Sequence, residues 1–105
     1  MIFRGRRFGD LVARQLELFA DENAGLIADC EAAERAYDDA ERDEAEERYG
    51  DYLDLVSTGT EILAGMRDHY ARDSLDDAAA ADYERAFNKA AAKRFPRFAL
   101  ELEDT

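Results

Sequence analysis

Apolar residues recur along most of the chain at alternating steps of three and four, the heptad spacing of a helix that packs along one stripe. The first stripe comprises Val12, Leu16, Phe19, Asn23, Leu26, Cys30, Ala33, Tyr37 and Ala40. The second comprises Ala45, Tyr49, Tyr52, Val56, Gly59, Leu63, Met66 and Tyr70. The pattern therefore predicts two long helices, over about 8–39 and about 43–72.

The two stripes are out of phase, which indicates a turn between them. Continuing the first stripe beyond Ala40 would bring the charged Glu44 and Glu47 into it, whereas the apolar spacing restarts at Ala45. We therefore expect a turn near 39–43 and two antiparallel helices that pack along their stripes.

A third, shorter helix is predicted over about 75–95. Ser74 is expected to cap its first N–H groups. Pro96 disfavours helical geometry at Phe95 and ends the helix. The tail, 96–105, is expected to form either a short strand or a docking segment.

These elements predict an all-α fold in a single helical domain, 1–105. Because the third helix is shorter than the other two, the hairpin near its turn would lack a third partner. A long hairpin with uncovered apolar surface usually buries that surface against a second copy. We therefore expect a homodimer with a four-helix core made from two hairpins.

Polar and small residues interrupt both stripes at one level. Asn23 on the first helix would face Gly59 on the second, with Thr58 and Thr60 beside it. A buried polar layer of this kind fixes the register of packed helices. Two alternatives remain: Thr58 and Glu61 could form a capping box that breaks the second helix, or the missing side chain of Gly59 could open a ligand pocket.

The charge of the chain is strongly negative, because 26 acidic and 14 basic residues give a net charge of −12. Such a charge repels phosphates and anionic lipid surfaces, so we expect no direct binding to nucleic acid or membrane. Seven acidic residues lie between 38 and 47. A run of this kind is usually a solvated helix end, but it could also imitate a nucleic-acid backbone.

Both ends of the chain combine arginine with phenylalanine. These residue types are typical anchors of protein interfaces, although each arginine could instead neutralise the acidic body of the protein. The candidate interaction residues are Arg4, Arg6, Arg7, Phe8, Phe95, Arg97 and Phe98.

Residue types that carry catalysis or hold cofactors are sparse. Cys30 lies on an apolar stripe, where a thiol is a poor nucleophile, and His69 is the one histidine. The Glu-x-x-His pair of di-iron bundles and the Gly-rich phosphate loop are both missing from the sequence. We therefore predict no enzyme, no catalytic residue, no metal and no cofactor.

The sequence predicts a non-enzymatic helical interaction or assembly protein that self-associates through its heptad-patterned helices. We expect a protein partner with a basic or apolar surface. A cytoplasmic location is also expected, because neither a signal peptide nor a membrane-spanning run is apparent. The alternatives are an acidic nucleic-acid mimic that binds a basic DNA-binding protein, and a small metal- or ligand-binding helical bundle.

Overall fold

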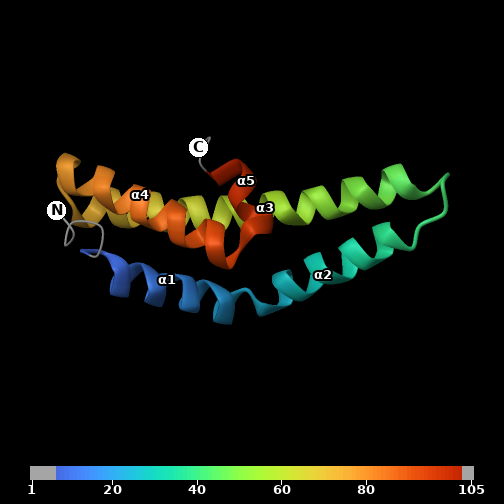
Figure 1. Ribbon diagram of the computed structural model, residues 1–105, viewed down its shortest axis with the longest axis horizontal. Helices are drawn as coiled ribbons and strands as arrows, with labels where there is room; N and C mark the ends of the chain where they lie inside the picture. The colour runs from blue at the N-terminus through green and yellow to red at the C-terminus, as the bar shows by residue number, and fades with distance from the viewer. Residues whose placement is uncertain (1–6, 103–105) are drawn as a thin grey trace.

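The computed structural model describes residues 7–102, with the backbone alone at 100 and 101, and it consists of five helices (Figure 1). The prediction of an all-α fold is confirmed for these residues, which contain no strand. The molecule is elongated and measures 52 × 25 × 24 Å. The helices are α1 (Gly9–Glu22), α2 (Ala24–Asp38), α3 (Ala45–Ser74), α4 (Asp77–Arg94) and α5 (Pro96–Leu102).

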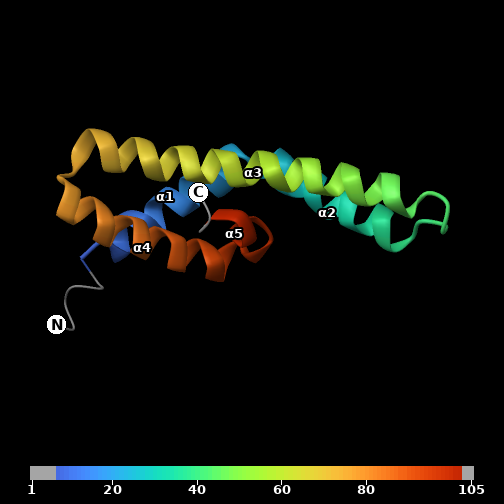
Figure 2. The ribbon, with the colours of Figure 1, turned by 90° about the horizontal axis from the view of Figure 1, so that it is seen from above.

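Helix α3 runs almost the full length of the molecule and packs against α2, α4 and α5 (Figures 1 and 2). Helix α2 packs antiparallel against the first half of α3, and α4 packs against both α1 and the second half of α3. Helix α4 runs parallel to α1, because Phe8, just before α1, meets Tyr83 in the first half of α4, and Glu17, in the second half of α1, meets Arg94 at the end of α4. Helix α5 folds back against α3 and α4.

The core lies where α1, α3, α4 and α5 meet. Its largest fully buried side chains are Tyr83, Phe19, Phe87, Phe98, Leu63 and Leu102. Complete burial of a side chain of this size contributes roughly 1.5–3 kcal/mol. This half of the molecule therefore carries most of the stabilisation from apolar burial.

The single helix predicted over 8–39 is divided at Asn23, which corrects the prediction. The backbone there has φ −120° and ψ 27°, outside the helical region. The Asn23 side-chain Nδ2 and backbone N–H both donate to the carbonyl oxygen of Phe19, at 3.0 and 2.9 Å. An asparagine side chain that competes for a helical carbonyl disfavours a regular helix. The chain bends here, so that α1 and α2 are separate helices.

Helix α3 is continuous through Gly59, so the alternative of a helix break at this point is wrong. The Thr58 hydroxyl caps no helix and instead donates to the carbonyl of Asp54 in the preceding turn, at 3.1 Å. Gly59 is therefore an interior position of α3, with neighbours on both sides in helical geometry.

The start of α4 also differs from the prediction. Asp76, not Ser74, is the N-cap, and its Oδ1 accepts a hydrogen bond from the backbone N–H of Ala79 at 2.8 Å. Ser74 is the last residue of α3.

Residues 96–102 of the tail form a docked helix, so the alternative of a short strand is wrong for this part of the tail. One residue, Phe95, separates α4 from α5, and Pro96 is the first residue of α5. Proline suits this position because the first N–H of a helix has no intrahelical partner. Phe98 and Leu102 lie one turn apart in α5, and both are buried.

Candidate interaction surface

Half of the α2–α3 pair extends beyond the rest of the molecule. We call residues 26–38 of α2 and 45–56 of α3 the arm, and residues 94–98, where α4 turns into α5, the elbow (Figure 2). Helices α4 and α5 extend no further along α3 than the elbow, so the arm is built from two helices only. The contact between two helices covers only part of their apolar faces. Apolar groups of the arm are therefore exposed to solvent.

Among the described side chains, three of the four exposed large apolar residues lie on the arm. Tyr37, Tyr49 and Leu53 have exposed fractions of 39, 45 and 40%, and the fourth, Leu18, lies on α1 with 51%. The rings of Tyr37 and Tyr49 meet across the two helices, with centroids 5.1 Å apart. These side chains form the apolar surface of the arm.

The position of Leu53 shows which side of the arm is open. Leu53 lies seven residues, or two turns, before Thr60, so the two share one face of α3. The Thr60 hydroxyl contacts the carbonyl of Phe98 in α5 at 2.9 Å. Leu53 therefore continues, into the arm, the face of α3 that α5 covers further along.

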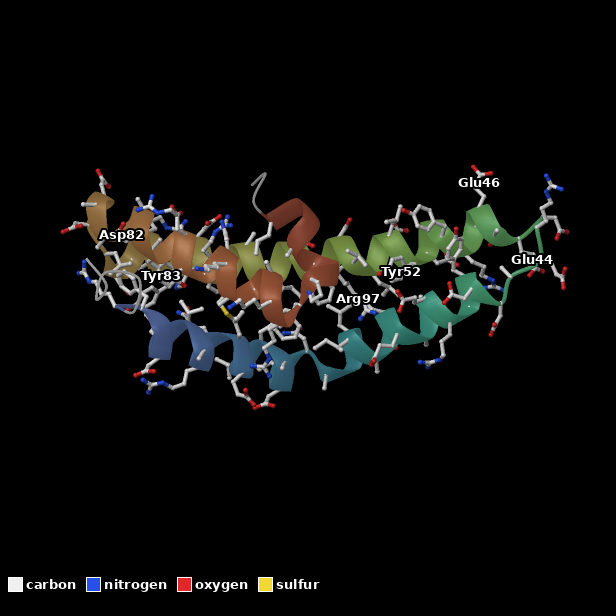
Figure 3. The ribbon with its side chains drawn as sticks, viewed as in Figure 1. Glu44, Glu46, Tyr52, Asp82, Tyr83 and Arg97 are labelled. Atoms are coloured by element: carbon white, nitrogen blue, oxygen red, sulfur yellow. The ribbon has the colours of Figure 1, made fainter. Side chains whose placement is uncertain are left out.

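The elbow closes one end of this open face with two arginines. Arg97 donates from Nε to the hydroxyl of Tyr52 at 3.3 Å and pairs through Nη2 with Glu34 at 3.1 Å (Figure 3). Burial opposes the charge of Arg97, but the hydrogen bond to Tyr52 and the nearby Glu34 outweigh it and raise its pKa. Arg94 pairs with Glu17 at 2.9 Å. The elbow therefore places two guanidinium groups, each paired with one exposed glutamate, at the end of the open face.

A pocket of about 300 Å³ opens at the elbow. Its lining consists of Ile27, Arg94, Phe95, Pro96, Arg97 and Phe98. Apolar side chains from two helices and two guanidinium groups together suit a group with an apolar body and a negative charge.

The other end of the arm is the acidic turn, residues 38–47. All seven of its carboxylate side chains are exposed, and none forms an ion pair with a residue in the described range 7–102. Glu44 and Glu46 extend away from the body of the molecule (Figure 3). The arm therefore carries exposed acidic side chains at its tip and two ion-paired arginines at the elbow.

The predicted interaction residues lie in different environments. Arg4 and Arg6 lie outside the described residues. Phe8 and Phe98 are buried, with exposed fractions of 7 and 2%. Phe8 packs edge-on against Tyr83, with centroids 5.6 Å apart. Both phenylalanines stabilise the fold and are not surface anchors, which corrects this part of the prediction.

The remaining candidates do not form one surface. Phe95 and Arg97 lie together at the elbow, where Phe95 is half-buried and packs against Phe19 at 5.1 Å between centroids. Arg7 is exposed beside the start of α1, with its guanidinium 5.0 Å from the ring centre of Phe8. Of the predicted interaction residues, Phe95 and Arg97 at the elbow are therefore the ones that can take part in a contact together with the arm.

The predicted polar layer is divided in the same way. Asn23 lies at the bend and Thr58 is exposed, whereas Gly59 and Thr60 are buried against α5. A Cβ at Gly59 would lie 2.6 and 2.7 Å from Cζ and Cδ1 of Phe98. The ring of Phe98 fills the space beside Gly59, so this position seats α5 and the alternative of a ligand pocket there is wrong.

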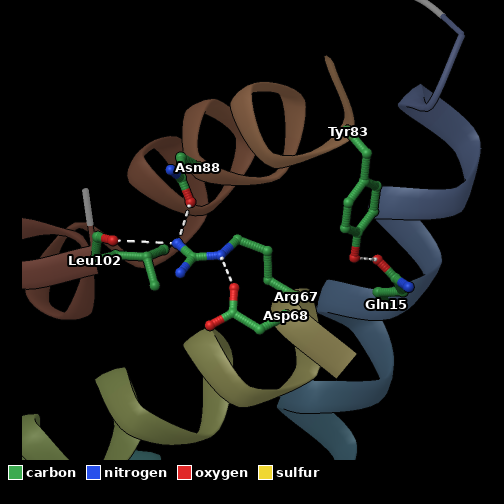
Figure 4. Close-up of polar contacts among 6 residues, drawn as sticks. All are labelled: Gln15, Arg67, Asp68, Tyr83, Asn88 and Leu102. Atoms are coloured by element: carbon green, nitrogen blue, oxygen red, sulfur yellow. Dashed lines mark hydrogen bonds and ion pairs between the residues drawn. The ribbon is translucent and has the colours of Figure 1, made fainter. Parts of the chain in front are cut away.

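A buried arginine that the sequence pattern did not single out ties three helices together. Arg67 Nη1 donates to Asn88 Oδ1 at 2.9 Å and to the carbonyl oxygen of Leu102 at 3.1 Å, and Nε pairs with Asp68 at 2.8 Å (Figure 4). Carbonyls in the last turn of a helix lack intrahelical donors, which makes them good partners for a cation. The sequence contains no signal for this role. Arg67 lies next to the apolar stripe, a position at which an arginine is ordinarily exposed to solvent.

A second internal polar contact joins α1 to α4. The hydroxyl of Tyr83 donates to Gln15 Oε1 at 2.7 Å (Figure 4). Burial raises the pKa of Tyr83 to about 12, although the hydrogen bond to Gln15 acts in the opposite direction. Tyr83 therefore stays protonated in the native protein over the physiological range.

The residues with reactive side chains are dispersed. Cys30 is fully buried, and burial raises the pKa of its thiol, which makes it a poor nucleophile. His69 is exposed, with Nε2 3.2 Å from Asp73 Oδ2. Within residues 7–102, three or more metal-ligating side chains do not come together anywhere.

Comparison of the chain with models of protein families, with curated proteins and with solved structures gives no match. Of the helices between residues 7 and 102, none has both the length and the apolar character needed to cross a bilayer. The function of the arm therefore has to be inferred from its own chemistry.

Proposed function

We propose that the protein is a non-enzymatic helical interaction protein that self-associates through its arm. The observation that carries this proposal is the open face of the arm, where Tyr37, Tyr49 and Leu53 are exposed beyond the end of α4 and α5. Apolar groups that are exposed together commonly mark a contact with another protein. Two arms packed face to face would form a four-helix core that encloses both sets of stripes.

Charge selects the antiparallel orientation of the two arms. In a parallel pair the two acidic turns would meet, and seven exposed carboxylates from each copy would repel one another. In an antiparallel pair the turns lie at opposite ends of the interface. The dimer then has a two-fold axis through the middle of the arm face, the usual symmetry of a homodimer.

The size of the arm sets the expected affinity. Residues 45–56 of α3 are about 18 Å long, and two helices side by side are about 20 Å wide. Two such faces bury about 700 Å² between them, which is less than the roughly 1,200 Å² of a stable interface. We therefore expect a concentration-dependent dimer with a Kd in the micromolar range, equivalent to about 8 kcal/mol or less.

Sedimentation velocity over a concentration series tests the proposal. The mass should rise from 11.9 kDa towards twice that value as the concentration passes through the micromolar range. Leu53→Glu places a charge in the apolar face and should raise the Kd at least about tenfold. Leu18→Glu is the matched control, because Leu18 is an exposed leucine outside the arm.

The control variant should dimerise like the wild type. A mass of 11.9 kDa at every concentration would overturn the proposal. So would an equal loss of association in both variants, because that result would assign the effect to surface charge in general.

The acidic turn supports a second candidate function, binding to a basic DNA-binding protein. The observation in its favour is that seven exposed carboxylates lie within ten residues and none is paired with a described residue. Core histones are a suitable probe. The wild type should compete with DNA for histones at low salt, and a Glu44→Gln, Glu46→Gln variant should compete more weakly. Equal competition by the two proteins would exclude this function.

A further inference from the structure

We infer that the elbow pocket is the binding site for the acidic turn of a second copy, so that Arg94 and Arg97 of one subunit hold carboxylates of the other. This inference rests on the proposed self-association and adds a site and its ligand to it. The ligand is an acidic helix end, and each subunit contributes both a turn and a pocket.

The length of the arm brings these two features together. The arm starts at the turn and ends at the elbow (Figure 2). A two-fold axis through the middle of the arm face lays each arm along the full length of the other. Each acidic turn therefore reaches the elbow of the other subunit.

The chemistry of the pocket matches the turn. The pocket has an apolar lining from Ile27 and Phe98 and carries the guanidinium groups of Arg94 and Arg97. Among the described residues, the hydrogen bonds of Arg97 use Nε and Nη2, and that of Arg94 uses Nη1. Because a guanidinium group has five N–H donors, both arginines have donors left for an incoming carboxylate.

The present partners of the two arginines do not compete strongly with such a ligand. Glu17 and Glu34 are exposed, with side-chain exposed fractions of 64 and 50%. Exposed ion pairs of this kind contribute little to stability, roughly 0–1 kcal/mol. An incoming turn, whose carboxylates have no described partner, can therefore join these pairs as a network or replace them.

Charge reversal on the two sides provides the test. The elbow variant carries Arg94→Glu and Arg97→Glu, and the turn variant carries Glu44→Arg and Glu46→Arg. Each variant alone should self-associate at least about tenfold more weakly than the wild type, since like charges then meet at both contacts. When the two variants are mixed, both contacts join opposite charges, so a heterodimer should form with nearly the affinity of the wild type.

A matched control uses charge at the other end of the molecule. Arg72→Glu with Arg85→Glu changes the net charge as much as the elbow variant does, at two exposed positions outside the arm. This control should retain the Kd of the wild type and should not form a preferred heterodimer with the turn variant. Circular dichroism checks that all variants keep their helical content.

If the elbow variant fails to fold, neutral substitutions provide the same information. Arg94→Gln with Arg97→Gln and Glu44→Gln with Glu46→Gln should each weaken the dimer, and combining all four should weaken it little further, because both pairs remove the same contact. Additive losses would overturn the inference.

The inference and the proposed function fail in different ways. If Leu53→Glu abolishes the dimer while the mixed charge variants show no rescue, the arm is the interface and the elbow pocket is not the site of the turn. If the wild type is a monomer at every concentration, both fail together.

Discussion

The close packing of α5 on α3 makes Gly59→Ala a sensitive probe of the core. The added Cβ would lie 2.6 and 2.7 Å from ring atoms of Phe98. The ring cannot move freely, because it packs edge-on against Phe19 at 5.8 Å and in a tilted arrangement against Phe95 at 6.2 Å between centroids. Overpacking a core costs roughly 1–3 kcal/mol. Because several ring atoms must be displaced, we take the upper end of this range.

The same substitution also improves the helix. Alanine is favoured over glycine by about 1 kcal/mol inside a helix, so the net loss expected for Gly59→Ala is about 2 kcal/mol. Gly65→Ala is the matched control, because Gly65 lies in the same helix with open space around its missing Cβ. This control should gain about 0.5–1 kcal/mol.

Urea unfolding followed by far-ultraviolet circular dichroism measures both variants. The free energies of unfolding should change in opposite directions, with Gly59→Ala below the wild type and Gly65→Ala above it. If Gly59→Ala were as stable as the wild type, Phe98 would not occupy the space beside Gly59, and the seating of α5 described above would be refuted.

Three further expectations concern the interior. The unfolded chain releases the proton of Tyr83 near pH 10, whereas the native protein retains it up to about pH 12, so stability should fall by up to about 2.7 kcal/mol between these values. Tyr83→Phe should lose less stability than the wild type between pH 9 and pH 11 in urea unfolding, and equal losses would contradict the assignment. Arg67→Leu removes the donor to the carbonyl of Leu102 and should cost about 2–4 kcal/mol, with faster hydrogen exchange in α5; unchanged exchange in α5 would contradict this role. Cys30 should react with a thiol reagent at least about a hundredfold more slowly in the native protein than in urea, and comparable rates would show that the arm is open around it.

The helices could be predicted because apolar spacing follows directly from helical geometry. The bend at Asn23 could not, since a single residue outside the helical region hardly changes the spacing of its neighbours. The seven-residue helix α5 was also beyond the pattern. Phe98 and Leu102 are four apart, which suits one face of a helix and one side of a strand equally well, and only contact with Gly59 and Arg67 decides between them.

The candidate surface was partly predictable for a similar reason. Comparison of the helix lengths indicates that a third helix cannot cover the arm, so the exposure of Tyr37 and Tyr49 could be expected. The buried positions of Phe8 and Phe98 could not be predicted, because phenylalanine next to arginine in the sequence is found both at interfaces and at the edge of a core. Only the three-dimensional contacts distinguish these cases.

Small-angle X-ray scattering over a concentration series tests antiparallel self-association most directly. Each molecule is 52 Å long, and two molecules that overlap along an arm of about 18 Å extend to about 85 Å. We expect the mass to approach twice 11.9 kDa at high concentration, with a maximum dimension near this value. A constant mass of 11.9 kDa, or a dimer little longer than one molecule, would contradict self-association through antiparallel arms.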